Sequence, residues 1–131
     1  PESHAIQMAA IQDYKGFYDQ EIALRRSMDY PPFTNIFSVL ITGQKEQEVI
    51  EAAQRLGAMM QYYNQKVGFS ILGPTPAALP KFRGEYRWRL FVKGTDAERL
   101  KSFVLYTVDK VKKEKRRKLH FHLAFNPQNL V

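Results

Sequence analysis

Apolar residues in the central and C-terminal parts of the chain recur with two different periods. Alternation predicts four β-strands, over residues 35–42, 69–72, 86–93 and 119–125. Helical spacing predicts two amphipathic helices between them, one over about residues 45–65 and one that begins near residue 95. The order βαββαβ is typical of an α+β domain with two helices on one face of a four-stranded antiparallel sheet. We expect the other face to stay free for a ligand or a neighbouring domain.

The second helix has recognisable signals at both ends. Thr95-Asp96-Ala97-Glu98 is read as a capping box, in which the Thr95 hydroxyl accepts a hydrogen bond from an orphan N–H and the Glu98 side chain reaches back. The helix is expected to bury the stripe Leu100, Val104, Val108 and Val111. It ends in the basic run Lys110–Lys118, and cations at a helix C-terminus also suit its dipole.

The chain divides near Tyr30-Pro31-Pro32-Phe33, because proline disfavours helical backbone in the residue before it. Residues 1–29 are expected to form a helical segment that links to a preceding domain, and residues 30–131 to form the C-terminal α+β domain. The chain starts without Met, which suggests a fragment of a longer protein.

Residues 73–94 hold the densest set of signals. The Gly-Pro-x-Pro sequence is expected to form a stiff turn rather than to pair in the sheet, because proline fixes φ and lacks a donor. A basic loop, Lys81–Gly84, follows. In the next strand, Tyr86, Trp88, Leu90 and Val92 are expected to point into a core, and Arg87, Arg89, Phe91 and Lys93 to point away from it.

The charge is distributed unevenly between the two halves of the chain. The formal net charge is +7, yet residues 1–60 carry five Lys/Arg against eight Asp/Glu, and residues 61–131 carry fifteen against five. A basic half of this size predicts a polyanion or an acidic peptide as partner. The chain has no cysteine, which suits a reducing cytoplasm, and no apolar run that could span a membrane.

Candidate chemistry is scarce. The chain has no GxxxxGK[ST], GxGxxG or HExxH motif, so no phosphate or metal cradle is predicted. His120 and His122 share a strand face, but a zinc site needs a third ligand, and exposed histidines are the better interpretation. We therefore predict no catalysis, no metal site and no cofactor within this fragment.

Binding is the better prediction. Cations around Phe91, with Lys81 and Arg83 upstream, suit nucleic acid through phosphate contacts and base stacking. They suit an acidic peptide equally well, because arginine pairs with carboxylates bidentately. A third alternative is an interaction scaffold that packs on a neighbouring domain without binding DNA. An RNA-binding α+β module also stays open, although Arg83–Trp88 places charges where its signature has aromatic rings.

Several separated motifs resemble the C-terminal domain of the PriA family, the primosomal protein N′ replication-restart DNA helicases. They are His4-Ala5-Ile6-Gln7, Asp13-Tyr14, Tyr30-Pro31-Pro32-Phe33, Ile71–Ala77, and Gly84 followed by Tyr86-Arg87-Trp88-Arg89. The resemblance spans nearly the whole chain. It implies a ferredoxin-like fold similar to that of a small-subunit ribosomal protein.

The resemblance also implies a function for the parent protein. Members of this family are ATP-dependent 3′-to-5′ DNA helicases of the bacterial cytoplasm that act in replication restart and primosome assembly. ATP, Mg and Zn belong to the parent chain. The C-terminal domain contributes to binding forked or single-stranded DNA, and helps to dock the acidic tail of single-stranded DNA-binding protein beside other primosome proteins.

Two sets of site residues follow from the charge pattern and the resemblance. The predicted nucleic-acid contacts are Lys81, Arg83, Lys93, Lys112, Lys113, Lys115, Arg116 and Arg117. The predicted peptide contacts are Tyr86, Arg87, Trp88 and Arg89, in which the two arginines meet the carboxylates of the tail.

Overall fold

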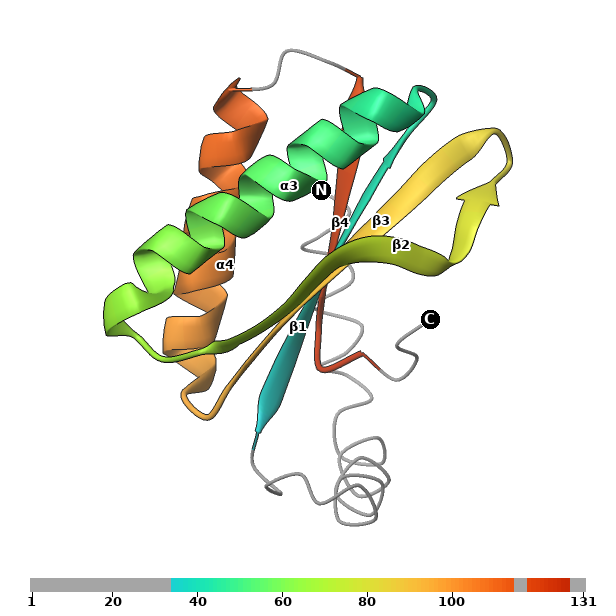
Figure 1. Ribbon diagram of the computed structural model, residues 1–131. Helices are drawn as coiled ribbons and strands as arrows, with labels where there is room; N and C mark the ends of the chain where they lie inside the picture. The colour runs from blue at the N-terminus through green and yellow to red at the C-terminus, as the bar shows by residue number, and fades with distance from the viewer. Residues whose placement is uncertain (1–33, 115–117, 128–131) are drawn as a thin grey trace.

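A computed structural model describes residues 34–114 and 118–127 of the chain (Figure 1). Its elements are β1 (Asn35–Gly43), α3 (Glu46–Tyr63), the short 3-10 helix η1 (Asn64–Lys66), β2 (Ser70–Phe82), β3 (Glu85–Gly94), α4 (Ala97–Glu114) and β4 (Leu119–Phe125). The predicted helical segment over residues 1–29 lies outside the described residues, so it stays a prediction.

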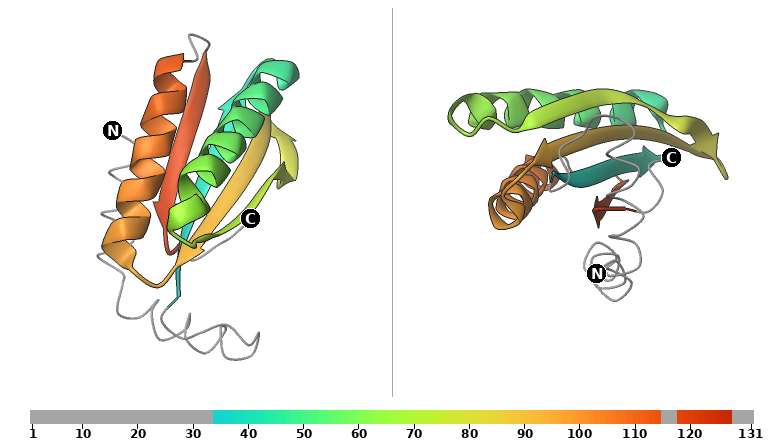
Figure 2. Two further views of the ribbon diagram at one scale, coloured as in Figure 1. Left: turned by 60° about the vertical axis from the view of Figure 1, so that its left-hand side comes forward. Right: turned by 90° about the horizontal axis from the view of Figure 1, so that it is seen from below.

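The four strands form one antiparallel sheet in the order β2-β3-β1-β4. Figure 2 shows α3 and α4 packed side by side against the same face of this sheet. The predicted α+β class, the βαββαβ order and the placement of both helices on one face are therefore confirmed. We call the opposite face, which is turned away from α3 and α4, the far face.

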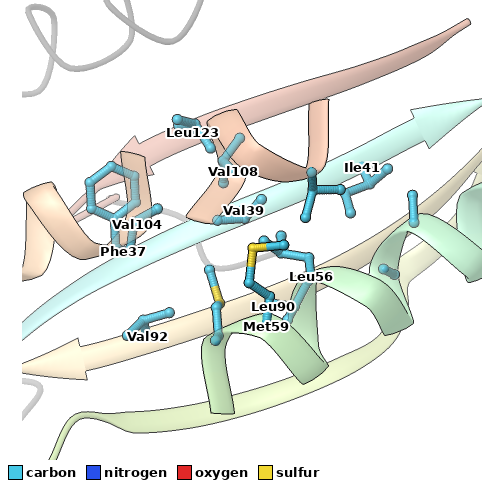
Figure 3. Close-up of a cluster of buried hydrophobic side chains, with 14 of the residues drawn as sticks. Phe37, Val39, Ile41, Leu56, Met59, Leu90, Val92, Val104, Val108 and Leu123 are labelled. Carbon is cyan, nitrogen blue, oxygen red and sulfur yellow. The ribbon is translucent and has the colours of Figure 1, made fainter. Parts of the chain in front are cut away.

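The core lies between the helices and the sheet. Phe37, Val39 and Ile41 alternate along β1, and they pair across to Val92, Leu90 and Trp88 of β3. The helices contribute the buried residues Val49, Ala53, Leu56, Met60, Leu100, Val104, Val108 and Val111. Figure 3 shows part of this core, in which Leu56, Val104 and Val108 of the helices face the strand residues Val39 and Leu90. Each fully buried Leu or Val stabilises the fold by about 1.5–3 kcal/mol, so the apolar periodicity correctly indicated what holds the sheet and the helices together.

β2 is much longer than predicted, because the proline-rich segment continues the strand. Thr75 pairs with Arg89 and Pro76 with Trp88, so the prediction of an unpaired Gly-Pro-x-Pro turn was wrong. Proline is tolerated here because β2 lies at the edge of the sheet and has a neighbour on one side only. Gly73, at φ 99°, makes the local bend possible: an added Cβ would lie 2.7 Å from the Arg89 carbonyl oxygen.

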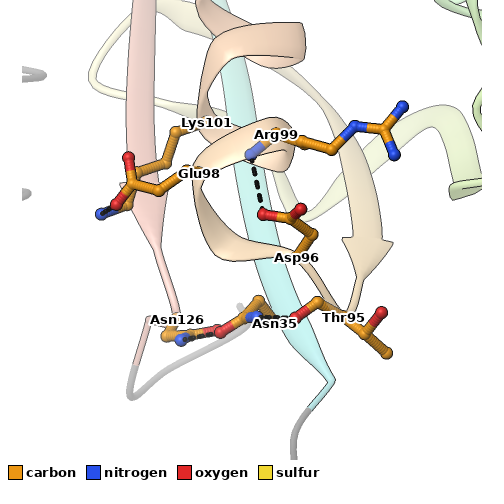
Figure 4. Close-up of polar contacts among 7 residues, drawn as sticks. All are labelled: Asn35, Thr95, Asp96, Glu98, Arg99, Lys101 and Asn126. Carbon is orange, nitrogen blue, oxygen red and sulfur yellow. Dashed lines mark hydrogen bonds and ion pairs between the residues drawn. The ribbon is translucent and has the colours of Figure 1, made fainter.

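The cap of α4 differs from the predicted capping box. The Asp96 carboxylate accepts a hydrogen bond from the Arg99 N–H at 3.2 Å (Figure 4). Thr95 lies one residue too early, and its carbonyl oxygen accepts instead from the Asn35 side chain at 3.2 Å. Glu98 faces Lys101, with the carboxylate 3.8 Å from the ammonium nitrogen. Asp96 is the N-cap, because its carbonyl oxygen also accepts a helical hydrogen bond from the Leu100 N–H at 3.0 Å.

Asn126 fastens the end of β4 to the start of β1. Its Oδ1 accepts from the Ile36 N–H at 2.7 Å, and its own N–H donates to the Ile36 carbonyl at 2.7 Å. The Asn126 Nδ2 donates to Asn35 Oδ1 at 3.1 Å, as Figure 4 shows. Asn126 has φ 48°, a left-handed conformation that Asn adopts more readily than most residues. These hydrogen bonds lock the end of β4 to the start of β1.

Candidate functional site

The ends of β2 and β3 form a hairpin that we call the hairpin arm (residues 76–88). Lys81 pairs with Tyr86 and Phe82 with Glu85, which leaves Arg83 and Gly84 as a two-residue turn. Both have positive φ, 50° and 80°, as a type I′ turn requires. The predicted four-residue basic loop is therefore shorter, because Lys81 and Phe82 belong to the strand. Figure 1 shows the arm on the side of the sheet away from α4.

A bulge in β2 bends the arm. Between the pairs Pro76–Trp88 and Lys81–Tyr86, residues 77–80 lie opposite Arg87 alone. The Arg87 Nη1 donates to the Leu79 carbonyl oxygen at 2.8 Å. The bulge leaves Leu79 without a paired residue in β3, so the guanidinium provides the hydrogen bond that its carbonyl would otherwise lack. Arg87 therefore has a structural role, and its fork still offers further donors to a ligand.

Two cations lie at the tip of the arm, and both are exposed. The Lys81 ammonium nitrogen lies 4.8 Å from the centre of the Tyr86 ring, and the Arg83 guanidinium carbon lies 5.0 Å from the centre of the Phe82 ring. Among the described residues, no ion pair of 4.0 Å or less involves either side chain. These charges can therefore meet an external anion without first leaving an internal partner. We call Lys81 and Arg83 the basic tip.

The C-terminal end of α4 supplies a second group of cations at the same end of the sheet. Gly43 of β1 pairs with Tyr86 on one side and with Leu119 on the other, so the arm and the start of β4 flank one strand end. The Lys112 nitrogen lies 6.0 Å from the Phe121 ring centre, and Lys113 pairs with Asp109 at 3.0 Å. Lys115, Arg116 and Arg117 lie outside the described residues.

Lys93 does not join either group. It pairs with Ile36 and Ser70, at the opposite end of β3. At about 3.3 Å per residue, Lys93 lies roughly 23 Å along the strand from Tyr86. The predicted nucleic-acid residues that the structure describes therefore fall into three places: the basic tip, the end of α4, and the distant Lys93.

The four predicted peptide residues divide between the two faces of the sheet. Tyr86 and Trp88 pack against the core on the helix side, whereas Arg87 and Arg89 lie on the far face. The Arg89 guanidinium carbon lies 5.8 Å from the Phe91 ring centre. Partial burial, and secondarily the charge of Arg87, lower the pKa of Arg89. A carboxylate bound beside Arg87 and Arg89 would reduce the repulsion between their positive charges. This favours an acidic peptide as a ligand of the far face.

The two histidines of β4 lie on the far face as predicted. Their ring centres are 6.3 Å apart, and His122 Nε2 lies 3.2 Å from the Thr42 hydroxyl oxygen. Residues 34–114 and 118–127 contain no group of three or more side chains that could hold a metal ion. In that same part of the chain, neither long helix is apolar enough to cross a membrane.

An aromatic groove lies at the other end of the molecule, between the end of α3 and the first half of α4. It has a volume of about 610 Å³, and its lining includes Tyr63, Phe69, Phe103 and Tyr106. Tyr63 packs edge-on against Tyr106 at 5.4 Å between ring centres, and Phe69 packs against Phe103 at 5.1 Å. These mutual contacts explain the groove as the seam between two helices.

Sequence reasoning did not single out Phe82. Its ring is 48% exposed at the tip of the arm, directly beside the basic tip. The sequence offered one signal for Phe82, namely its position between two cations and two residues before a glycine. That signal is weak, because the strand assignment that exposes the ring depends on the long β2.

Comparisons with known proteins agree with this architecture. The family model of the primosomal protein N C-terminal domain matches residues 26–128. Replication restart protein PriA of Thermotoga maritima is 33% identical over 100 residues, which is 76% of this chain and 13% of the relative. That of Haemophilus influenzae is 31% identical over 119 residues, which is 89% of this chain and 16% of the relative. That of Synechocystis is 32% identical over 93 residues, which is 71% of this chain and 11% of the relative.

A solved structure supports the fold alone. The de novo designed protein Foldit4 has a TM-score of 0.53, covers 73% of this chain and 99% of that chain, and is 14% identical. The chain spans less than a fifth of the length of the three relatives named above. Because the family model matches well over half of the sequence, the chain belongs to the family of primosomal protein N (PriA) C-terminal domains.

Proposed function

We propose that this chain is a non-catalytic DNA- and partner-binding domain of a PriA-type protein, an ATP-dependent 3′-to-5′ helicase that acts in replication restart and primosome assembly. In this proposal residues 1–29 link it to the helicase lobes, and residues 30–131 form the binding domain. ATP, Mg and Zn would be held by the rest of such a protein. The names of the relatives support a role in replication restart. The exposed positive charges of the arm support a role for this domain in binding DNA.

The single observation that carries DNA binding is the exposed basic tip at the end of the sheet that also holds the α4 cations. Phosphates are the anions that such a surface meets in forked or single-stranded DNA, and each contact releases a counterion. Lys81 and Arg83 are assigned to phosphates first, and Lys112 and Lys113 second. Lys93 lies too far along β3 to share the same few phosphates.

A titration of the chain with labelled forked DNA at several salt concentrations tests the proposal. For duplex contacts the logarithmic salt slope should be about 0.9 per neutralised phosphate. We expect the double variant Lys81→Glu/Arg83→Glu to weaken binding at least tenfold and to lower the slope by about two. The double variant Lys66→Glu/Arg99→Glu, which reverses two exposed cations at the other end of the domain, is the charge-matched control. Affinity that does not respond to salt would contradict DNA binding.

The same proposal assigns the far face near Arg87 and Arg89 to the acidic tail of single-stranded DNA-binding protein. A carboxylate beside two guanidinium groups gains bidentate hydrogen bonds and reduces their repulsion. Reversing Arg89 to Glu should lower the affinity of an acidic peptide that ends in an apolar residue by about tenfold or more, and the control is Arg99→Glu on α4. Equal affinities would place the peptide elsewhere. A chain that binds neither DNA nor peptide would favour the scaffold alternative, in which this face packs on the helicase lobes.

A further inference from the structure

Phe82 is an exposed aromatic residue at the tip of the hairpin arm, between the two cations of the basic tip. It is the last residue of β2, it pairs across the hairpin with Glu85, and 48% of its surface is exposed. A ring of this size usually stabilises a core, where it can remove about 150–250 Å² from water. Here the core is complete without it, because Phe82 is absent from both the buried cluster and the partly buried residues packed against that cluster.

The neighbours of Phe82 fix the ring and leave part of it accessible. The Arg83 guanidinium carbon lies 5.0 Å from the ring centre, a distance typical of a cation–π contact. Exposure of about half of the side chain fits a ring with one face covered by Arg83 and the other open. Lys81 precedes Phe82 along the chain but points to the other face of the hairpin, where its ammonium nitrogen lies 4.8 Å from the Tyr86 ring centre. The two cations can therefore reach phosphates on either side of a base that stacks on Phe82.

We propose that Phe82 stacks on an unpaired DNA base where a duplex meets a single strand, while Lys81 and Arg83 contact the flanking phosphates. This inference rests on the proposed DNA-binding function and names the feature of DNA that the arm selects. Every base has a π-face, so stacking on an aromatic side chain tolerates any sequence. A continuous duplex buries those faces within its own stack, so the ring gains a contact only when a base is unpaired.

The shape of the tip favours one unpaired base over a long single strand. Binding a tract of single strand requires a succession of rings along a groove. In the described arm, the other aromatic side chains at hand are Tyr86 and Trp88, and both pack against the core on the helix side. The narrow turn of the arm, with the accessible ring of Phe82 beside it, therefore fits the junction at which the two DNA strands separate.

The experiment compares two DNAs that differ only in the presence of unpaired bases. One is a duplex closed at both ends by non-nucleotide linkers, and the other is the same closed duplex with a ten-nucleotide flap at its centre. We expect Phe82→Ala to weaken flap binding about tenfold and to leave closed-duplex binding within twofold. Phe82→Trp should restore flap binding. Leu79→Ala is the matched control, because Leu79 is 47% exposed on the same strand and has no ring.

A fluorescent base analogue at the first unpaired position gives a second readout. The parent chain, Phe82→Trp and the control Leu79→Ala should quench its fluorescence. Phe82→Ala should not, because it lacks the ring that stacks on the base. If Phe82→Ala lost affinity equally for both DNAs, or lost none for the flap DNA, the stacking proposal would be overturned. The proposed DNA-binding function would still stand if the parent chain bound DNA in a salt-dependent way. A parent chain that binds neither DNA at low salt would overturn both. Circular dichroism checks that each variant is folded.

Discussion

β3 passes through two regions of opposite construction. In its second half, Leu90 and Val92 are fully buried and lie between β1 and the two helices. In its first half, which belongs to the hairpin arm, β3 pairs with a bulged, proline-containing part of β2. There Leu79 and Phe82 are about half exposed. One strand thus joins a fully packed region to an arm that contacts the core through Tyr86 and Trp88 and whose outer part is held by backbone pairing and the Arg87–Leu79 hydrogen bond.

This difference separates stability from binding. The packed half determines whether the chain folds, because burial of apolar surface dominates the free energy of folding. The cations of the arm contribute little to that free energy, since exposed charges interact weakly in water. Substitutions in the packed half should therefore change the free energy of unfolding, whereas substitutions of the arm cations should change binding and leave that free energy nearly unchanged.

Truncating Leu90 should cause the largest loss of stability. Leu90→Ala removes a fully buried side chain at the centre of the sheet, and we expect a loss of about 2–5 kcal/mol in the free energy of unfolding, measured by urea denaturation. Leu79→Ala in the arm removes the same atoms from an exposed position and should cost less than about 0.5 kcal/mol. Similar losses for the two variants would show that the arm belongs to the core.

Removing the Asn126 side chain should come next. Asn126→Ala leaves the buried Ile36 N–H without its acceptor and places alanine at φ 48°, so we expect a loss of about 2 kcal/mol. Asn126→Asp keeps the accepting oxygen and should lose less. If denaturation gave the two variants equal stability, the hydrogen bond to Ile36 would not be the element that fastens β4 to β1.

The cap of α4 should have a moderate effect. Asp96→Ala removes the acceptor of the Arg99 N–H, which typically costs about 1 kcal/mol. Thr95→Ala and Glu98→Ala should each cost only a few tenths of that, because neither forms the predicted capping box. A larger loss for Thr95→Ala than for Asp96→Ala in the same denaturation series would restore the capping box.

The smallest global effect is expected at Arg87. Arg87→Met removes the hydrogen bond to Leu79, and we expect a change in unfolding free energy of less than about 1 kcal/mol. Hydrogen exchange at residues 78–81 should nevertheless become faster, because the bulge loses its brace. Arg99→Met on α4 is the control. Unchanged exchange in the bulge would mean that backbone pairing alone shapes the arm.

The sequence predicted the packed half well because that half follows periodic rules. Alternation along β1, β3 and β4 and the helical stripes identified the core and both faces of β3. Leu90 and Arg89 were assigned to opposite faces correctly, since a strand directs neighbouring side chains to opposite sides. The βαββαβ order also correctly indicated an antiparallel sheet with both helices on one face.

The arm and the caps were predicted less well, because they depend on contacts between distant parts of the chain. Proline in residues 73–80 argued against a strand, yet an edge strand tolerates it. Thr95 and Asp96 are both good N-caps by residue type, and the hydrogen bonds of the folded helix identify Asp96 as the cap. The lock at Asn126 joins residues 90 positions apart, which no local pattern reveals.

The most direct test of the account is an NMR titration of the labelled chain with forked DNA at low salt. We predict that the largest amide shift changes fall in residues 79–86 of the arm and at Lys112 and Lys113, and that they diminish as salt is added. Asn35, Thr95 and Asn126, at the opposite end of the sheet, should not change. Largest changes at that opposite end, or no changes at low salt, would contradict the assignment of DNA binding to the arm.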